Sequence, residues 1–364
     1  MLGSNRVYLA LALVTTAAAV VGIAAGCGGG DTVSTTSSTS GSGGGSGTST
    51  STASSSSDAS SSGTGGPACT SGEGIVLAVT KLSFGDGNNG QWKKVGVNLD
   101  GLSSTAASSD LCKLNDGAFS VTPYPDGENG IDNSFGKNLL PQMIALYPTL
   151  VADTNNGITN GVFTVLLKLD CVTKTGDVPS FTTKLFGGTA LGSKPKFDGT
   201  DKWPVAPELL SDPMNPQSST IVFPSSSIVG DAYAGGKNET FILTVPLNTT
   251  TTSSSIKLTV YAAHTTMTLS ADRKSAIGGK IGGVLNTEEF VAEIKKVGAL
   301  LALCDNSIFP GLLTTIRQAS DIMADGTQDT TKVCDGISIG LGFEMKEVLL
   351  GDVGKATPIG ASCP

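Results

Sequence analysis

The sequence predicts a mainly β protein: an antiparallel β-sandwich or jelly-roll-like domain with a C-terminal helical hairpin packed on it. Short runs rich in β-branched and aromatic residues recur along the chain, and Gly, Pro, Asn and Asp separate them. Charged residues make up 15% of the chain and there are 48 glycines, so strands and loops should outnumber exposed helices. The strand runs do not alternate with helical ones, which argues against a parallel βαβ fold.

The expected strands follow one another along most of the folded part. The strongest is 161–172, because it is the richest in β-branched and aromatic residues. The segment 91–99 is a weaker strand. The full set is 74–84, 91–99, 161–172, 180–186, 219–223, 239–247, 255–262, 265–270, 275–285 and 336–350.

Two late segments predict helices that together form the hairpin. Thr287 can cap a helix whose first turn holds Glu288 and Glu289, and acidic residues suit the positive end of a helix dipole. The apolar residues that follow keep helical spacing. A second helix is expected over 307–324, with a proline in its first turn. A third is expected over 138–152, where two prolines interrupt the pattern.

The N-terminal residues 1–26 have the order of an export signal. Arg6 is the only charge among them, an apolar run follows, and small residues lead directly into Cys27. The run 23–27, Ile-Ala-Ala-Gly-Cys, resembles the lipobox of bacterial lipoproteins, although Ala24 stands where Leu is usual. Two alternatives stay open: a cleaved signal without a lipid, and an uncleaved anchor, since the apolar run is about long enough to span a bilayer.

The lipoprotein resemblance implies a location in the bacterial cell envelope. In that family the signal peptide is cleaved before the cysteine, here Cys27, which then carries fatty acyl chains such as palmitate. Gly28 after the cysteine, rather than Asp, implies transfer to the outer membrane or cell surface. Several acyl chains give stable anchoring. The expected partner is therefore a membrane, reached through the lipid.

Residues 27–67 comprise this cysteine and a low-complexity tether of Ser, Thr and Gly. Such a composition cannot bury enough surface to offset the entropy of ordering. A coil of this length has an end-to-end distance of about 35 Å. The alternative is a glycosylated stalk, because Ser/Thr-rich runs can carry sugars. Residues 68–364 remain as the folded, mainly β domain.

Setting Cys27 aside, the other six of the seven cysteines form an even set that predicts three disulfides in an exported chain. Six cysteines allow 15 connectivities, so the sequence leaves the pairing open. The most local candidate pair is Cys304–Cys334. In that arrangement Cys69 would pair with Cys363, and Cys112 with Cys171. The set is Cys69, Cys112, Cys171, Cys304, Cys334 and Cys363.

The charge and the missing motifs exclude several function classes. The formal net charge of −8 argues against nucleic acid as a partner. The sequence carries no HExxH, P-loop or dinucleotide fingerprint, and its folded part no Gly-x-Ser-x-Gly elbow. The single histidine, His264, lies between two strand runs and is more typical of a strand surface than of a catalytic triad.

A recurring D-x-[NE]-N-G pattern suggests a calcium site. It occurs at 86–90, 126–130 and 153–157. Oxygen ligands clustered on a turn are what Ca²⁺ requires, yet Asn-Gly also favours tight turns, so turn chemistry alone is the alternative. The candidate metal ligands are Asp126, Glu128, Asn129, Asp132 and Asn133.

These observations favour a membrane-anchored, extracytoplasmic protein with a non-enzymatic binding or envelope-structural role. Its expected ligand is a cell-surface glycan or protein. Two alternatives are open: a lipid-anchored hydrolase that acts on polysaccharide through dispersed carboxylates, and a calcium-stabilised adhesion module.

Overall fold

The computed structural model describes most of the folded part of the chain. The export signal, Cys27, the tether and Cys69 lie outside the described residues. The described residues are 74–86, 90–118, 120, 122, 124–146, 148–248, 253–300, 302–307, 309–356 and 360–364.

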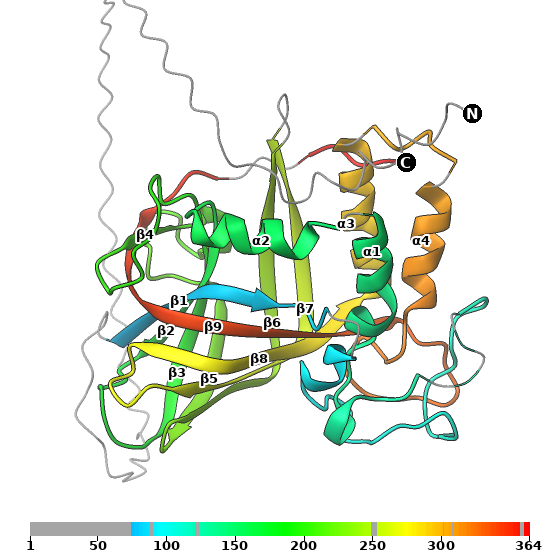
Figure 1. Ribbon diagram of the computed structural model, residues 1–364, viewed down its shortest axis with the longest axis horizontal. Helices are drawn as coiled ribbons and strands as arrows, with labels where there is room; N and C mark the ends of the chain where they lie inside the picture. The colour runs from blue at the N-terminus through cyan, green and yellow to red at the C-terminus, as the bar shows by residue number, and fades with distance from the viewer. Residues whose placement is uncertain are drawn as a thin grey trace, which may run out of the picture. The chain divides into compact units, whose positions relative to one another are not determined.

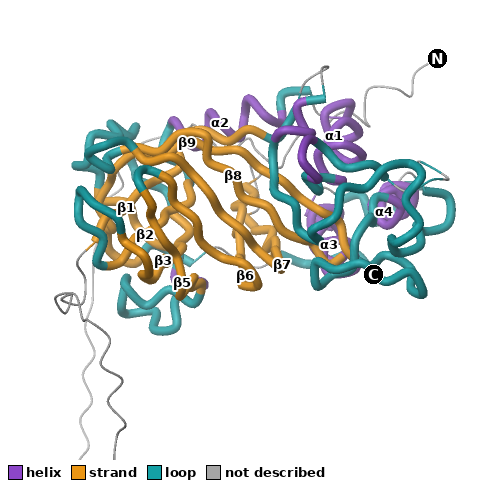
Figure 2. Tube along the Cα trace, turned by 90° about the horizontal axis from the view of Figure 1, so that it is seen from below, coloured by secondary structure: helices purple, strands orange, loops and turns teal. Residues whose placement is uncertain are grey.

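The strands form a closed antiparallel barrel, so the expected sandwich or jelly roll is wrong. Eight of the nine strands join in a ring in the order β1-β2-β3-β5-β6-β7-β8-β9, and β9 pairs back with β1 at Val76↔Val348. Figures 1 and 2 show these strands, with most of the helical segments gathered to one side of them. The strands are β1 Gly74–Ser83, β2 Thr164–Asp170, β3 Val178–Gly188, β4 Lys202–Val205, β5 Ile221–Val229, β6 Ala232–Asn248, β7 Ser253–Leu269, β8 Ser275–Asn286 and β9 Gly336–Val353.

Bulges in the long strands explain why the sheet closes. The register of β7 shifts between Tyr261 and His264, where Ala262 has φ 46°, and the register of β8 shifts around Gly278, which has φ 59°. Bulges bend strands and increase their twist, and a curved sheet can meet its own edge. Alternation of apolar and polar residues is the same in a sandwich and a barrel, so the sequence could not separate the two.

The expected strand positions mostly hold, with three changes. The short strand β4 was not predicted. The segments 255–262 and 265–270 form the single strand β7, interrupted only by its bulge. The segment 91–99 is not a strand, because a 3-10 helix, η1, occupies Gln91–Lys94. Two further 3-10 helices, η2 at Glu128–Gly130 and η4 at Pro207–Leu209, lie in loops.

Helices cover one end of the barrel. Near the middle of the chain, a π-helix, η3, at Phe135–Leu139 leads into α1 at Leu140–Leu146, and α2 follows at Leu150–Thr159. Later come α3 at Thr287–Leu300 and α4 at Phe309–Gln318, which pack against each other. Among the described residues, no helix is long and apolar enough to cross a membrane.

The helix ends differ in detail from the prediction. Asn286, rather than Thr287, caps α3, because its Oδ1 accepts hydrogen bonds from the backbone N–H groups of Glu288 and Glu289. The Thr287 hydroxyl instead lies 2.7 Å from the hydroxyl of Ser320. The helix expected over 307–324 is shorter at both ends.

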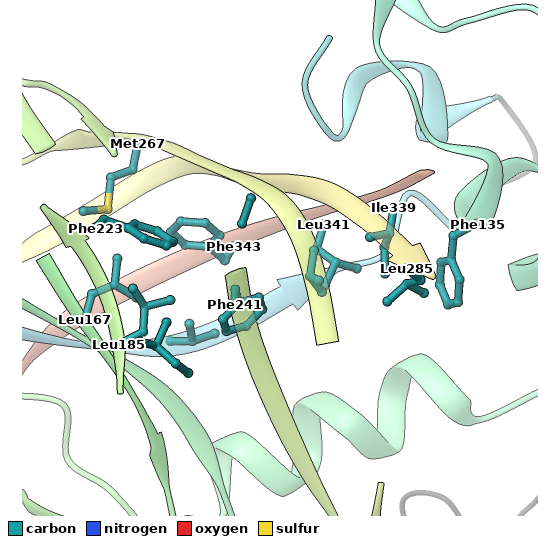
Figure 3. Close-up of a cluster of buried hydrophobic side chains, with 14 of the residues drawn as sticks. Phe135, Leu167, Leu185, Phe223, Phe241, Met267, Leu285, Ile339, Leu341 and Phe343 are labelled. Atoms are coloured by element: carbon teal, nitrogen blue, oxygen red, sulfur yellow. The ribbon is translucent and has the colours of Figure 1, made fainter. Parts of the chain in front are cut away.

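The main apolar core fills the barrel and continues beneath the helices. Inward-facing side chains come from the strands of the ring, and Phe135 at the helix-covered end joins the same cluster (Figure 3). A second, smaller cluster lies on the outer face of the barrel, where β4 runs parallel to β9 and covers it. Its largest member, Trp203, is fully buried.

Two disulfides hold the loops and the C-terminus, and neither of them is the local pair that the sequence suggested. Cys112 pairs with Cys334, and Cys304 pairs with Cys363. Cys171 is disulfide-bonded as well. The suggested Cys304–Cys334 pair is therefore wrong. The extended chain after β9 returns to α3, where the N–H of Cys363 donates to the carbonyl of Lys295, and this return was not visible in the sequence.

Candidate binding cavity at the helix-covered end of the barrel

An apolar cavity of about 140 Å³ lies between the barrel wall and the helices. Strands β1, β2, β7 and β9 form one side, and η3, α1, α2 and α3 form the other. The lining residues are Val79, Leu82, Phe84, Phe135, Leu140, Met143, Leu150, Thr154, Ile158, Phe163, Val165, Leu258, Phe290, Ile294, Ile339 and Leu341.

The lining offers a ligand almost no polar group. Thr154 is the one lining residue with a polar side chain, and its hydroxyl donates a 2.9 Å hydrogen bond to the carbonyl of Leu150 within α2. A charged or strongly polar group placed here would lose its water without gaining partners, which costs several kcal/mol. The cavity therefore suits an apolar group.

Helix α2 is fastened to the barrel by one asparagine. Asn155 Oδ1 accepts from the N–H of Leu82 at 2.8 Å, and Asn155 Nδ2 donates to the carbonyl of Leu82 at 3.0 Å. The amide thus pairs with the end of β1 as a neighbouring strand would. Gly157, two residues along, lets α2 approach the ring of Phe163, since a Cβ there would lie 2.8 Å from its Cε1 atom.

This arrangement changes the interpretation of one D-x-[NE]-N-G repeat. Residues 153–157 lie inside α2, not in a turn, and Asn155 and Gly157 serve helix attachment. The repeat at 86–90 includes residues 87–89, which lie outside the described part. The repeats at 126–130 and 153–157 can be compared, and they are similar in composition but not in structure.

A second cavity of about 50 Å³ adjoins the first between α1, α3 and α4. The two share Met143, Leu150, Phe290 and Ile294 in their linings. The smaller cavity alone has Gln142 and Thr315 among its lining residues, yet its lining surface is almost wholly apolar. The combined space is therefore apolar along its whole length.

The size of the larger cavity is energetically significant. Native interiors contain few voids larger than a water molecule. Left unfilled, a cavity of about 140 Å³ would cost on the order of 3 kcal/mol at about 24 cal/mol per Å³. An engineered apolar cavity of about 150 Å³ stays dry and binds benzene. A cavity of this size and chemistry is therefore suited to a small apolar ligand.

The residues proposed for calcium lie along one loop, and their side chains make separate contacts. Asp126 Oδ2 accepts from the N–H of Ser104 at 2.5 Å. Glu128 is exposed and forms a 3.7 Å ion pair with Lys94. Asn129 has φ 58°, the left-handed conformation favoured in turns.

The remaining two residues of that set are buried, and they hold the loop to a neighbouring loop and to β9. Asp132 Oδ2 accepts from the N–H of Leu99 at 2.7 Å. Asn133 Nδ2 donates to the carbonyl of Val95 at 2.9 Å, and its Oδ1 accepts from the N–H of Gly340 at 3.1 Å. Within the described ranges, no group of three or more His, Cys, Asp and Glu side chains is placed to hold a metal ion. Calcium binding stays a prediction, and hydrogen bonding accounts for the buried residues.

The same loop region contains carboxyl groups with raised pKa values. Burial raises the pKa of Asp132 to about 9, and the nearby charge of Asp100 adds to the shift. Burial also raises the pKa of Asp321 to about 7, although hydrogen bonds from the N–H and hydroxyl of Ser338 oppose it. Burial raises the pKa of Asp126 as well. The sequence did not indicate that Asp100 and Asp321 join this group, because both are distant in sequence from Asp132.

His264 has a structural contact. Its Nε2 lies 2.9 Å from the carbonyl oxygen of Lys237, across the irregular part of the β6–β7 ladder. The contact places the imidazole on the strand surface, where the sequence suggested it would lie.

Comparison with known proteins found no matching family model, no matching curated protein and no matching solved structure. The site therefore has to be interpreted from its own geometry. Sequence reasoning missed its lining residues, since apolar residues at strand or helix spacing predict core packing whether or not they enclose a cavity.

Proposed function

We propose that this chain is a lipid-anchored, non-enzymatic binding protein of the bacterial cell envelope that holds a small apolar ligand at the helix-covered end of its barrel. The observation that carries the proposal is the apolar cavity between the barrel wall and α1, α2 and α3. Ligand sites are commonly found in the mouths of β-barrels and are mostly apolar. The ligand class expected from the sequence, a glycan or protein, fits this cavity less well, because sugars carry many hydroxyl groups.

The anchoring part of the proposal rests on the N-terminal sequence. The lipobox resemblance ends at Cys27, and the Ser/Thr/Gly run after it suits a flexible tether between a membrane and the domain. Disulfides are typical of oxidising compartments, and the folded part contains Cys112–Cys334 and Cys304–Cys363. An outer-membrane or cell-surface location is consistent with both.

The test is benzene binding, measured by calorimetric titration and by the rise in melting temperature. Val165→Phe places a ring in the cavity and should abolish the benzene effect. Val229→Phe is the matched control, because Val229 is 64% exposed on β5 and does not line the cavity. We expect wild type and Val229→Phe to bind benzene, and Val165→Phe to bind none.

Two results would contradict the proposal. One is wild-type protein whose melting temperature does not change with benzene. The other is hydrolysis of a glycan, ester or peptide by the purified protein that a single carboxylate substitution abolishes, since this would make the chain an enzyme.

A further inference from the structure

We infer that the natural ligand is an uncharged molecule with one unbranched alkyl chain, and that Met143 helps to set the length of chain it accepts. This inference rests on the proposed function and concerns the same site. The chain would occupy the larger cavity, pass Met143 and extend into the smaller cavity.

The linear shape follows from how the two cavities are arranged. They adjoin each other and share the side chains of Met143, Leu150, Phe290 and Ile294. A compact ligand the size of benzene fills only the larger one. An extended, flexible chain can use both, and each methylene group it buries contributes further affinity.

Met143 is the shared residue best able to regulate passage between the cavities. It is unbranched, with three rotatable side-chain bonds, so it adapts its shape more readily than Leu150, Phe290 or Ile294. It is half-buried in the middle of the short helix α1, outside the strands of the barrel, so its side chain can move without disturbing the barrel. Rotation of this side chain would widen the connection between the cavities.

The uncharged character of the ligand follows from the lining of the cavities. Among the described residues lining either cavity none is charged, and the hydroxyl of Thr154 in the larger cavity is already bonded within its helix. Gln142 and Thr315 line the smaller cavity, but its lining surface is almost wholly apolar. An ionised group placed in either cavity would lose its water without gaining partners.

Chain length gives the test. Scaling from a benzene-sized void of about 150 Å³, the two cavities hold a chain of about eight carbons. We therefore propose calorimetric titration of the full chain with 1-alkanols from butanol to dodecanol. Affinity should rise about fourfold per methylene group until about eight carbons and then level off. At the same chain length, 1-octanol should bind more tightly than octanoate.

Variants at two methionines then separate the role of Met143 from general effects. Met143→Ala should move the plateau to longer chains by about two carbons, because it removes side-chain volume between the cavities. Met214→Ala is the matched control, since Met214 is 87% exposed and lines neither cavity, and its plateau should equal that of wild type.

The outcomes distinguish this inference from the proposed function. If benzene binds and Val165→Phe abolishes it, but alkanol affinity shows no plateau, or a plateau that Met143→Ala leaves unmoved, the length inference is wrong and the binding function stands. Tighter binding of octanoate than of octanol would overturn the inference that the ligand is uncharged. If neither benzene nor any alkanol binds, the proposed function itself fails.

Discussion

Two apolar clusters lie on opposite faces of the same barrel wall, and they differ in how completely side chains fill the space. On β1, Val76 and Ala78 face the outer cluster beneath β4, whereas Leu77 and Val79 face the interior. The outer cluster is filled around Trp203. The interior cluster leaves the cavity where it meets the helices.

The outer cluster shows how closely this chain can pack. Trp203 stacks on Phe197 with ring centroids 5.8 Å apart, and its Nε1 donates to the carbonyl of Thr189 at 2.7 Å. Gly188 lies so close that a Cβ there would be 2.7 Å from Trp203 Nε1. Because one face of the wall is filled this well, the cavity on the other face is a local feature, which supports a role in binding.

The largest expected effect comes from removing the centre of the filled cluster. Trp203→Ala should lower the free energy of unfolding by about 3–5 kcal/mol, because it leaves a large hole among buried neighbours. Phe163→Ala, beside the cavity, should cost clearly less, since Phe163 is only partly buried. Urea denaturation of both variants measures this. Equal losses of unfolding free energy would mean that the two regions are packed alike, and the claimed difference between the two clusters would be wrong.

The pH dependence should come from the loop carboxyl groups and leave the cavity unaffected. A carboxyl group whose folded pKa is raised stabilises the protein at low pH, and this contribution is lost as pH rises through the folded value. The stabilisation from Asp321 should be lost progressively up to about pH 7, and that from Asp132 up to about pH 9. Stability should therefore fall by a few kcal/mol between pH 4 and pH 9 through these two groups.

Variants isolate that contribution. Asp321→Asn should flatten the dependence of the unfolding free energy on pH between about pH 4 and pH 7, measured by urea denaturation at each pH. Benzene affinity should stay constant over the same range, because no titratable side chain lines the larger cavity among the described residues. An unchanged slope in Asp321→Asn would show that this group does not carry the effect.

A smaller effect concerns the attachment of α2 over the cavity. Asn155→Ala removes both hydrogen bonds to the backbone of Leu82 and should cost about 1–3 kcal/mol of stability. It should also weaken benzene binding, because α2 forms one side of the cavity. Asn156→Ala is the matched control, since the neighbouring Asn156 side chain is exposed. If both variants bind benzene equally well, α2 is not held by Asn155 in the way proposed.

The strands and helices were largely predictable, and their arrangement was not. The apolar pattern of 161–172 and of the segment after Thr287 indicated β2 and α3, because both patterns are local. Closure of the barrel depends on the pairing of β1 with β9, which are at opposite ends of the described fold. No local pattern reports such a contact. The same holds for Cys304–Cys363, which required the chain after β9 to return to α3.

The candidate site was less predictable still. The sequence drew attention to Asp126, Asp132 and Asn133 because polar residues in a turn-rich segment are conspicuous. Their structural use is to join loops to one another and, through Asn133, to β9. The cavity is made of apolar residues such as Met143 and Ile294, which look like any core positions. Whether apolar side chains meet or leave space depends on the three-dimensional packing alone.

The most direct test is a crystal structure of the protein under xenon pressure. Xenon binds apolar cavities of this size and shows their position without relying on any assumed ligand. We predict a xenon atom in the larger cavity, beside Val165 and Ile158, in wild type and in Val229→Phe, and none there in Val165→Phe. If instead the wild-type side chains of α1 and α2 close over this space and xenon does not bind there, the cavity is not a binding site and the account is wrong.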